Sequence, residues 1–259
     1  MQIIPVFVKA PKLKQKKEDP TILAITDFSK SSTNAILFAA HLFRDTTLKI
    51  NLLNIFENPT DKATLLISVE DILMKESVIS LKKQAAEIAF VLKKQKPTIL
   101  SHSISEALKK GIAKIAESEK IDLIVAGIPA GKYPSEYLND YPILYIGQSK
   151  YPVLLVPENC VDKPVRSVLT LNFDSAKQQN TENKDLEHIV NHDHIDKYTI
   201  NINEKKIDRK VTASLQSMLK KEEVELITLI PAPGDKIDKA LLDYRIQELY
   251  NTTASLLSY

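Results

Sequence analysis

Short apolar runs alternate with stretches of helical hydrophobic spacing along the first 158 residues of the chain. This alternation constrains the fold strongly, because strands that are each followed by a helix form a parallel sheet with helices on both faces. Right-handed crossovers then make the α/β sheet doubly wound. The runs expected to form strands are residues 22–25, 48–55, 98–104, 121–126 and 153–156.

Helical patterns separate these strands. Ser29 is placed to cap the first helix, because its hydroxyl can accept a hydrogen bond from an unpaired first-turn amide. A long helix is expected over residues 69–92, and a further one around residues 138–148. The apolar residues that predict the inward faces are Ala35, Phe38, Ala39 and Leu42, then Ile72, Ile79 and Ala86, then Leu108, Ile112 and Ile115.

The rest of the chain repeats this alternation over a shorter length. Strands are expected at residues 168–173, 198–202 and 225–230, and helices around residues 211–219 and 241–257. We divide the chain into an amino-terminal strand with a Lys-rich linker (1–19), a first domain (20–158), a linker (159–164) and a second domain (165–259).

An internal repeat indicates that the two halves are related. The segment ISEALKKGIAKIAESEKIDLIVAGIPAG from Ile104 parallels INEKKIDRKVTASLQSMLKKEEVELITLIPAPG from Ile202. The segment ILAITDF, ending at Phe28, parallels VLTLNF, ending at Phe173. The second copy is expected to have lost one strand–helix unit near residues 174–196.

Charge and cysteine content exclude several classes of protein. The net charge is +2, which argues against a dedicated nucleic-acid binder, because neutralising phosphates needs a concentrated basic surface. Cys160 is the only cysteine, so no intrachain disulfide can form, which suits a reducing compartment. No run approaches the roughly 20 apolar residues of a membrane span. We therefore expect a cytoplasmic protein that partners neither nucleic acid nor membrane.

No set of residues has the spacing of a catalytic or metal centre. Histidines at i and i+4 in the polar segment near residue 190 could bind zinc on a helix face, but a solvated helix end is the preferred interpretation. No Ser-His-Asp spacing suggests a nucleophile, so no catalytic residue and no enzyme activity are expected. The residues weighed here are His188, His192, Asp193 and His194 in that segment, the isolated His41 and His102, and Cys160.

Three segments resemble the universal stress protein family. TILAITDFSKSSTNAILFAAHL is similar to the opening strand, Asp-x-Ser and helix of that family, EKIDLIVAGIPAG to its strand with a glycine loop, and SKYPVLLVPE to its closing strand. The resemblance covers residues 20–158 and, more faintly, the rest. It implies two Rossmann-like (adenine nucleotide alpha hydrolase-like) domains, with strand order 3-2-1-4-5 in the first and a shortened sheet in the second.

The resemblance also implies a nucleotide site, since many members of the family bind ATP at the carboxyl ends of the strands. Asp27 matches the acidic residue near the adenosine. Ile55 matches the position whose backbone holds adenine, and Gly127 matches the first glycine of the phosphate loop.

The phosphate loop then departs from the family pattern of Gly, two residues, Gly, nine residues, Gly and Ser/Thr. Ala130 stands where the second glycine belongs, with Gly131 one place late. The nine-residue gap leads to Asp140 or Tyr141, and Gly147 comes later still. Glycine matters there because a Cβ blocks the approach of backbone amides to phosphate, and Asp140 would repel it.

The sequence is compatible with three functions. The preferred one is a non-enzymatic stress-response or regulatory protein that binds an as yet unknown protein partner, with a homodimer as one form, and uses no cofactor. The alternative is an ATP or adenine-nucleotide sensor that uses Asp27, Ile55, Gly127, Gly131 and Gly147 in the first domain. An enzyme such as an adenylyl transferase would need metal-binding acids that the sequence does not offer.

The amino terminus carries a second copy of the closing strand. The first half has Pro-Val-Leu-Leu-Val at residues 152–156, whereas the second half stops at Tyr259, just where such a strand should begin. IIPVFVKAP near the amino terminus has the missing pattern. We therefore predict a circularly permuted tandem, in which residues 3–8 complete the second sheet beside residues 153–156 and the halves pack about a pseudo-two-fold axis.

Overall fold

The computed structural model describes residues 6–8, 19–43, 47–56, 69–105, 107–129, 151–158, 160, 165–172, 196–201 and 224–230. Its elements are β1 (Val6–Val8), β2 (Thr21–Ile25), α1 (Lys30–Leu42), β3 (Lys49–Phe56), α2 (Val69–Val91), β4 (Thr98–Ser105), α3 (Leu108–Ser118), β5 (Leu123–Ile128), β6 (Val153–Pro157), β7 (Ser167–Asn172), β8 (Asp196–Asn201) and β9 (Leu226–Ile230).

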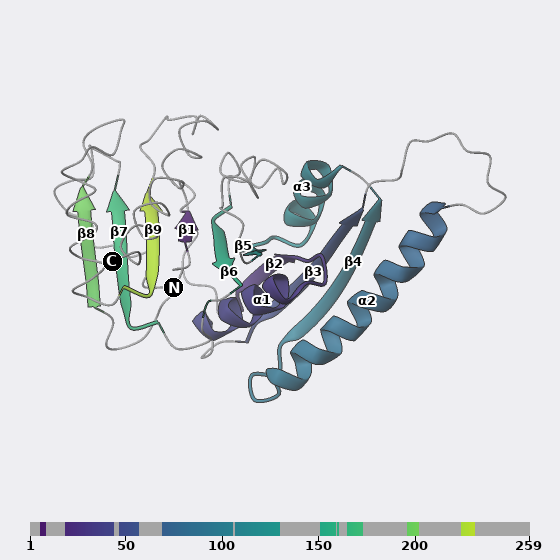
Figure 1. The fold of residues 1–259 in the computed structure, drawn as a ribbon, viewed down its shortest axis with the longest axis horizontal. Coiled ribbons are helices and arrows are strands. Elements are labelled where there is room, and N and C mark those ends of the chain that lie inside the picture. Colours follow the sequence, from purple (N-terminus) through teal and green to yellow (C-terminus); the bar gives the residue numbers. More distant parts are fainter. Residues whose placement is uncertain are drawn as a thin grey trace, which may run out of the picture.

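The described strands form one sheet in the order β4-β3-β2-β5-β6-β1-β9-β7-β8 (Figure 1). Neighbours from β4 to β6 are all parallel. If these five strands are numbered along the chain from β2 to β6, their order across the sheet is 3-2-1-4-5. This confirms the predicted fold of the first half.

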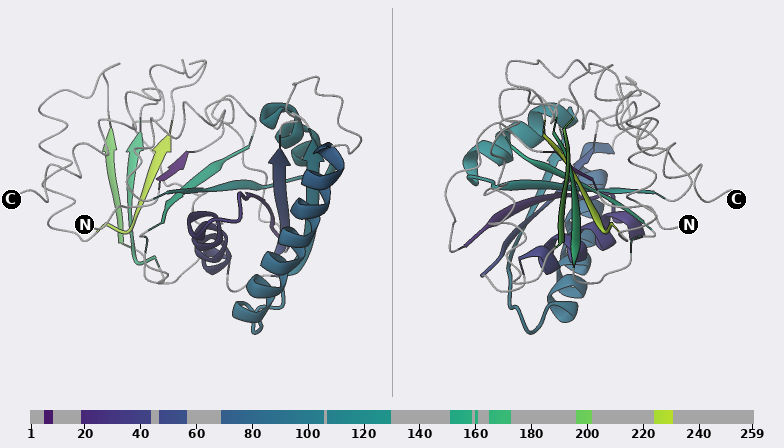
Figure 2. Two further views of the ribbon diagram at one scale, coloured as in Figure 1. Left: turned by 45° about the vertical axis from the view of Figure 1, so that its right-hand side comes forward. Right: turned by 90° about the vertical axis from the view of Figure 1, so that its left-hand side faces the viewer.

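The helices of the first half lie on both faces of the sheet, as doubly wound topology requires (Figure 2). Ser77 of α2 bonds to Asn54 of β3, whereas Gly111 of α3 packs against Ile55, the next residue of that strand. Successive strand residues point to opposite faces, so α2 and α3 cover opposite sides. The central strands β2 and β5 are buried at every position, as strands covered on both faces must be.

Helix α1 forms as its sequence predicts. Ser29 is the N-cap, and its hydroxyl accepts a hydrogen bond from the backbone N–H of Ser32 at 3.2 Å. The predicted stripe of Ala35, Phe38, Ala39 and Leu42 is buried throughout. Complete burial of a large aliphatic side chain contributes about 1.5–3 kcal/mol, so this face fixes the helix on the sheet.

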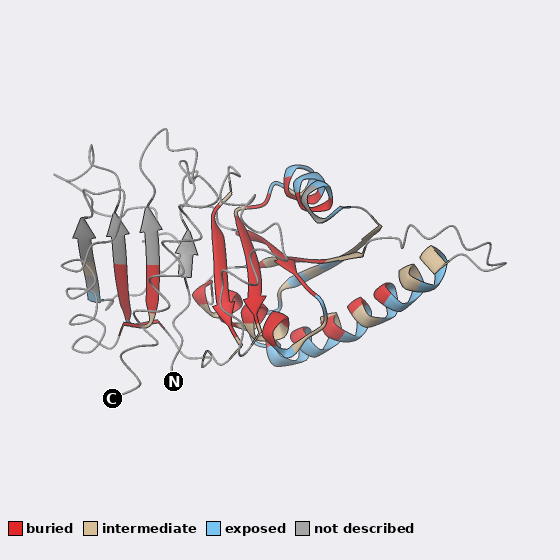
Figure 3. Cartoon of the chain, turned by 45° about the horizontal axis from the view of Figure 1, so that its top comes forward, coloured by how far each residue is buried: buried red, intermediate tan, exposed pale blue. Residues whose placement is uncertain are grey.

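The predicted inward face of α2 is wrong. The stripe of Ile72, Ile79 and Ala86 points outward, and Ile79 is 68% exposed. The residues that α2 buries are Ser77, Leu81, Gln84 and Ile88 (Figure 3). Two of these four are polar, and they find partners in the polar ends of the strands beneath. A stripe chosen by hydrophobicity alone therefore selected the opposite side of the helix.

Strand β1 lies within the nine-stranded sheet, between β6 and β9. Val6–Val8 pair antiparallel with Val153–Leu155 of β6 and parallel with Ile227–Leu229 of β9. This confirms that the amino-terminal strand joins the second half of the sheet and covers the edge of β6; residues 3–5 of the predicted strand lie outside the described residues. The otherwise open edge of an apolar strand is thus paired within the same chain.

The described strands of the second half follow the strand order of the first half, except that none of them occupies the place of the third strand. Strand β7 pairs in parallel with β8 on one side and with β9 on the other. Counted from β8 to β1, the order is 2-1-4-5, and the two halves meet antiparallel at their closing strands. This is the order expected for a pseudo-two-fold relation. The repeat aligned residues 198–202 with the third strand of the first half, but β8 occupies the place of the second.

Several predicted helices lie outside the described residues. They are those around residues 138–148, 211–219 and 241–257.

Candidate functional site

The predicted nucleotide residues that the structure describes gather at the carboxyl ends of neighbouring strands. Asp27 follows β2, Ile55 is the last but one residue of β3, and Gly127 is the last but one of β5. Pairing of Ile25 with Leu53 and with Ala126 puts these positions at one level of the sheet. Gly131 and Gly147 lie outside the described residues.

A tight turn links β2 to α1 beside this edge. Phe28 has a φ of 65°, a left-handed conformation that is uncommon for a bulky residue. The hydroxyl of Thr26 accepts a hydrogen bond from the backbone N–H of Phe28 at 2.9 Å, and Phe28 also packs against the core. One carboxylate oxygen of Asp27, which is exposed, accepts a bond from the N–H of Ser29 at 3.0 Å. These contacts set the direction in which α1 leaves the sheet.

Gly127 lies directly against the first turn of α1. A Cβ built at this position would overlap the carbonyl of Ser31 and stand 2.6 Å from the nitrogen of Ser32. Only glycine allows the strand and the helix to approach so closely. Gly127 is therefore needed because the amino-terminal end of α1 occupies the space that a side chain would fill.

Several polar groups in the first turn of α1 bond to one another. The Ser29 carbonyl accepts bonds from the N–H of Thr33 at 3.1 Å and from the hydroxyl of Ser32 at 2.9 Å. The hydroxyls of Ser29 and Ser31 are 2.8 Å apart. Ser31 and Ser32 are both buried. The residues around Ser29 thus use the hydroxyl groups of the turn for capping.

A buried polar network joins this turn to α2. The Thr26 hydroxyl donates to Oε1 of Gln84 at 2.8 Å, and Nε2 of Gln84 donates to the Thr33 hydroxyl at 3.0 Å. Gln84 is only 4% exposed. A buried amide left without partners would cost about 1–3 kcal/mol, so both bonds help to hold α2 in register.

The network continues across the strand ends. Nδ2 of Asn54 donates to the Thr26 carbonyl at 2.8 Å, and Oδ1 of Asn54 accepts from the Ser77 hydroxyl at 2.7 Å. The Ser103 hydroxyl donates to that of Ser77 at 2.6 Å. The hydrophobic pattern did not reveal these residues. The available signal was that Ser77 and Gln84 lie on the side of the long helix opposite to Ile72 and Ile79.

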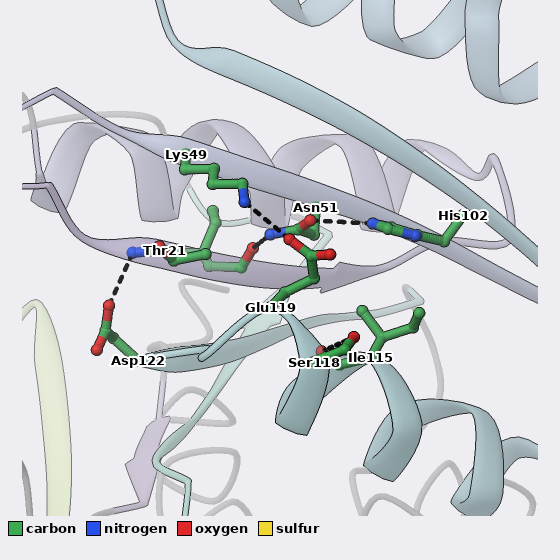
Figure 4. A network of polar contacts seen from close by, with 9 residues as sticks. Thr21, Lys49, Asn51, His102, Ile115, Ser118, Glu119 and Asp122 are labelled. Atoms are coloured by element: carbon green, nitrogen blue, oxygen red, sulfur yellow. Dashed lines mark hydrogen bonds and ion pairs between the residues drawn. The ribbon is translucent and has the colours of Figure 1, made fainter.

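The opposite face of the sheet carries a second polar group of residues, shown in Figure 4. Nζ of Lys49 forms an ion pair with Glu119 at 2.7 Å, and the hydrogen bond from Lys49 lowers the pKa of the Glu119 carboxyl. Nε2 of His102 lies 2.9 Å from Oδ1 of the fully buried Asn51. Burial lowers the pKa of His102, which keeps the ring neutral at neutral pH. The predicted scaffold role of His102 fits this environment.

The described residues contain no group of three or more His, Cys, Asp or Glu side chains that could hold a metal ion. The segment with His188, His192, Asp193 and His194 lies outside them. Cys160 is half-buried and packs against the core. No helix in the described part of the chain is long and apolar enough to cross a membrane.

A comparison with models of protein families identifies the family of this chain. The model of the universal stress protein family matches residues 20–157, which is more than half of the 259 residues. The chain belongs to the universal stress protein family. The match covers every strand from β2 to β6, and its end at residue 157 coincides with the end of β6.

Solved universal stress proteins are similar to this chain at low identity. One in complex with cAMP is 21% identical, with a TM-score of 0.37, over 53% of this chain and 96% of that chain. UspA from Lactobacillus plantarum is 15% identical, with a TM-score of 0.41, over 53% and 97%. A universal stress protein from Archaeoglobus fulgidus DSM 4304 is 18% identical, with a TM-score of 0.47, over 87% and 80%. Curated proteins give no match.

Proposed function

We propose that this universal stress protein is a non-enzymatic stress-response protein that acts in the cytoplasm through a protein partner and does not use ATP. The packing at Gly127 is the observation that supports this most. The space that its missing side chain leaves is filled by the carbonyl of Ser31 and the nitrogen of Ser32. The fold needs this glycine with or without a nucleotide, so its presence does not argue for a phosphate site.

The other matched residues also have partners within the protein. The carboxylate of Asp27 accepts a bond from the N–H of Ser29. The backbone of Ile55 lies in β3, in register with Ile104 of β4. Ala130 and Asp140 replace the glycines that phosphate would require at the expected spacing. These substitutions weaken the attraction that oriented amides at a helix terminus exert on an anion.

Adenine-nucleotide binding by the first half is the alternative. It is favoured by the exposure of Asp27 and by the position of Asp27, Ile55 and Gly127 at one edge of the sheet. A universal stress protein of the same family has been solved with cAMP. The alternative cofactor is therefore ATP or a related adenine nucleotide.

Thermal unfolding with ATP, AMP and cAMP in the presence of Mg²⁺ distinguishes these functions. A ligand at a hundredfold excess over its Kd stabilises the native state by about 2.7 kcal/mol, which raises Tm by roughly 5–10 °C. We expect no shift and no calorimetric heat of binding. A micromolar Kd that is lost in Asp27→Ala would overturn the proposal and favour the nucleotide sensor.

We also propose that residues 165–259, completed by β1, form a degenerate second universal stress protein domain. The proposal is supported by the 2-1-4-5 order of β8, β7, β9 and β1 and by the internal repeat. At the places of Asp27 and Gly127, this half has Asn172 and Leu229. An uncharged amide and a branched side chain do not suit a nucleotide site, so this half is expected to have a structural role.

A further inference from the structure

Helix α2 exposes large apolar side chains on its outer face. Ile79 and Phe90 are 68% and 75% exposed, although the inner face of α2 buries Leu81 and Ile88 together with Ser77 and Gln84. Phe90 keeps this exposure although Nζ of Lys93 lies 5.7 Å from the centre of its ring. A large apolar side chain gains free energy when it leaves water. The outer face of α2 therefore has a reason to be covered.

Four of the exposed apolar residues of α2 form a stripe that charged side chains interrupt. Ile72, Ile79 and Ala86 are spaced seven residues apart, and Phe90 follows Ala86 by one turn. Residues spaced by three, four or seven positions share one face of a helix. A stripe with this spacing is suited to packing against a second helix.

The described second half of the chain cannot cover this stripe. Helix α2 packs on β4 and β3, which form one end of the sheet, whereas β7, β8 and β9 form the other end (Figure 1 and Figure 2). The edge of β6 is also unavailable to another molecule, because β1 is paired with it. The stripe is an apolar surface that the described residues leave open at the β4 end.

The charges on α2 indicate what covers the stripe. Its amino-terminal half carries Glu70, Asp71 and Glu76, with one lysine. The carboxyl-terminal half carries Lys82 and Lys83, with one glutamate. A second α2 that runs antiparallel would place the acidic half of each helix beside the basic half of the other.

We propose that the outer face of α2 is a self-association surface, on which two copies of this chain pair their α2 helices antiparallel about a two-fold axis near Ile79. In this arrangement Glu76 of each copy lies beside Lys83 of the other, and the isoleucines pack between them. Both charged residues are exposed, and each follows an isoleucine of the stripe by one turn. An isologous contact of this kind repeats each pair twice.

The size of the surface sets the strength of the association. A helix of 23 residues is about 34 Å long. One such helix on each side gives an interface at the low end of the roughly 1,200–2,000 Å² that specific complexes bury. The dimer is therefore weak and forms in a concentration-dependent manner. This inference does not depend on whether the first half binds a nucleotide.

Charge reversal measured by sedimentation velocity tests the arrangement. The 29.1 kDa full-length protein is expected to shift toward twice that mass as its concentration rises. Glu76→Lys and Lys83→Glu each place like charges together at two symmetric positions, and each is expected to weaken the dimer roughly tenfold. The double variant restores opposite charges and is expected to recover the affinity of the natural protein.

Matched controls separate this contact from general charge effects. Glu117→Lys and Lys110→Glu make the same changes at exposed positions of α3 and should leave the association unchanged. Ile79→Glu should abolish it, while circular dichroism and Tm show that the variant remains folded. A natural protein that stays monomeric, a dimer that tolerates Ile79→Glu, or a double variant that fails to recover would each overturn the proposal.

Discussion

Replacing Gly127 with alanine tests whether this glycine serves the packing of the sheet against α1. The added Cβ would overlap the Ser31 carbonyl and stand 2.6 Å from the nitrogen of Ser32. Both are backbone atoms in the first turn of a buried helix, so neither can move without shifting α1. The variant must therefore separate β5 from α1 or distort the turn that follows Ser29.

The expected cost follows from the nature of the obstructing atoms. Adding a methyl group to a well-packed interior typically costs 1–3 kcal/mol. Because backbone obstructs position 127, we expect the upper part of that range, about 2–3 kcal/mol. For a chain of this size, the loss corresponds to a fall in Tm of roughly 4–12 °C. Urea denaturation should show a lower midpoint at an unchanged slope.

Gly111→Ala is the matched control. A Cβ at position 111 would stand 2.7 Å from Cδ1 of Ile55, which is the far end of a flexible side chain that can rotate away. Position 111 is also inside α3, where alanine is favoured over glycine by about 1 kcal/mol. The control should therefore change the free energy of unfolding by less than about 1 kcal/mol. If Gly127→Ala is as stable as Gly111→Ala, the packing role of Gly127 is refuted.

Three further perturbations test other parts of the fold. Deleting residues 1–10 removes β1, so it should lower Tm and cause aggregation through the uncovered edge of β6, which light scattering detects; unchanged stability and solubility would contradict the permuted arrangement. Gln84→Ala removes the bonds to two threonine hydroxyls and should lower the unfolding free energy by about 1–3 kcal/mol in urea, whereas no loss would mean that the network does not stabilise α2. Burial lowers the pKa of His102 in the folded state, so as pH falls the unfolded chain takes up this proton first. The stability that the neutral ring contributes is present above pH 6.5 and is lost as pH falls from there toward the folded pKa; His102→Gln should flatten the dependence of Tm on pH in this window, and an unchanged profile would exclude the residue as its source.

Local pattern in the sequence was sufficient for much of the first half. The strands appeared as short apolar runs because strands that are buried on both faces have no polar side to alternate with. Helix α1 was predicted with its cap and its buried face, because Ser29 and the alanines act within a few residues of one another. The amino-terminal strand was also predicted, because its Pro-Val pattern repeats that of β6, and β1 pairs as expected.

The tertiary structure alone decided which side of α2 faces the sheet. The sequence offers two stripes, and Ile72 and Ile79 lie on the outer one, because the strand ends opposite α2 present Thr26 and Asn54 as hydrogen-bond partners. A helical phase chosen from hydrophobicity cannot take such partners into account, since they come from strands distant in the chain. The same reason applies to Gly127, whose small size is set by the approach of α1 across the sheet. Elements specified by local spacing were therefore determined by the sequence itself, whereas the packing partner of each face was fixed only when distant segments came together.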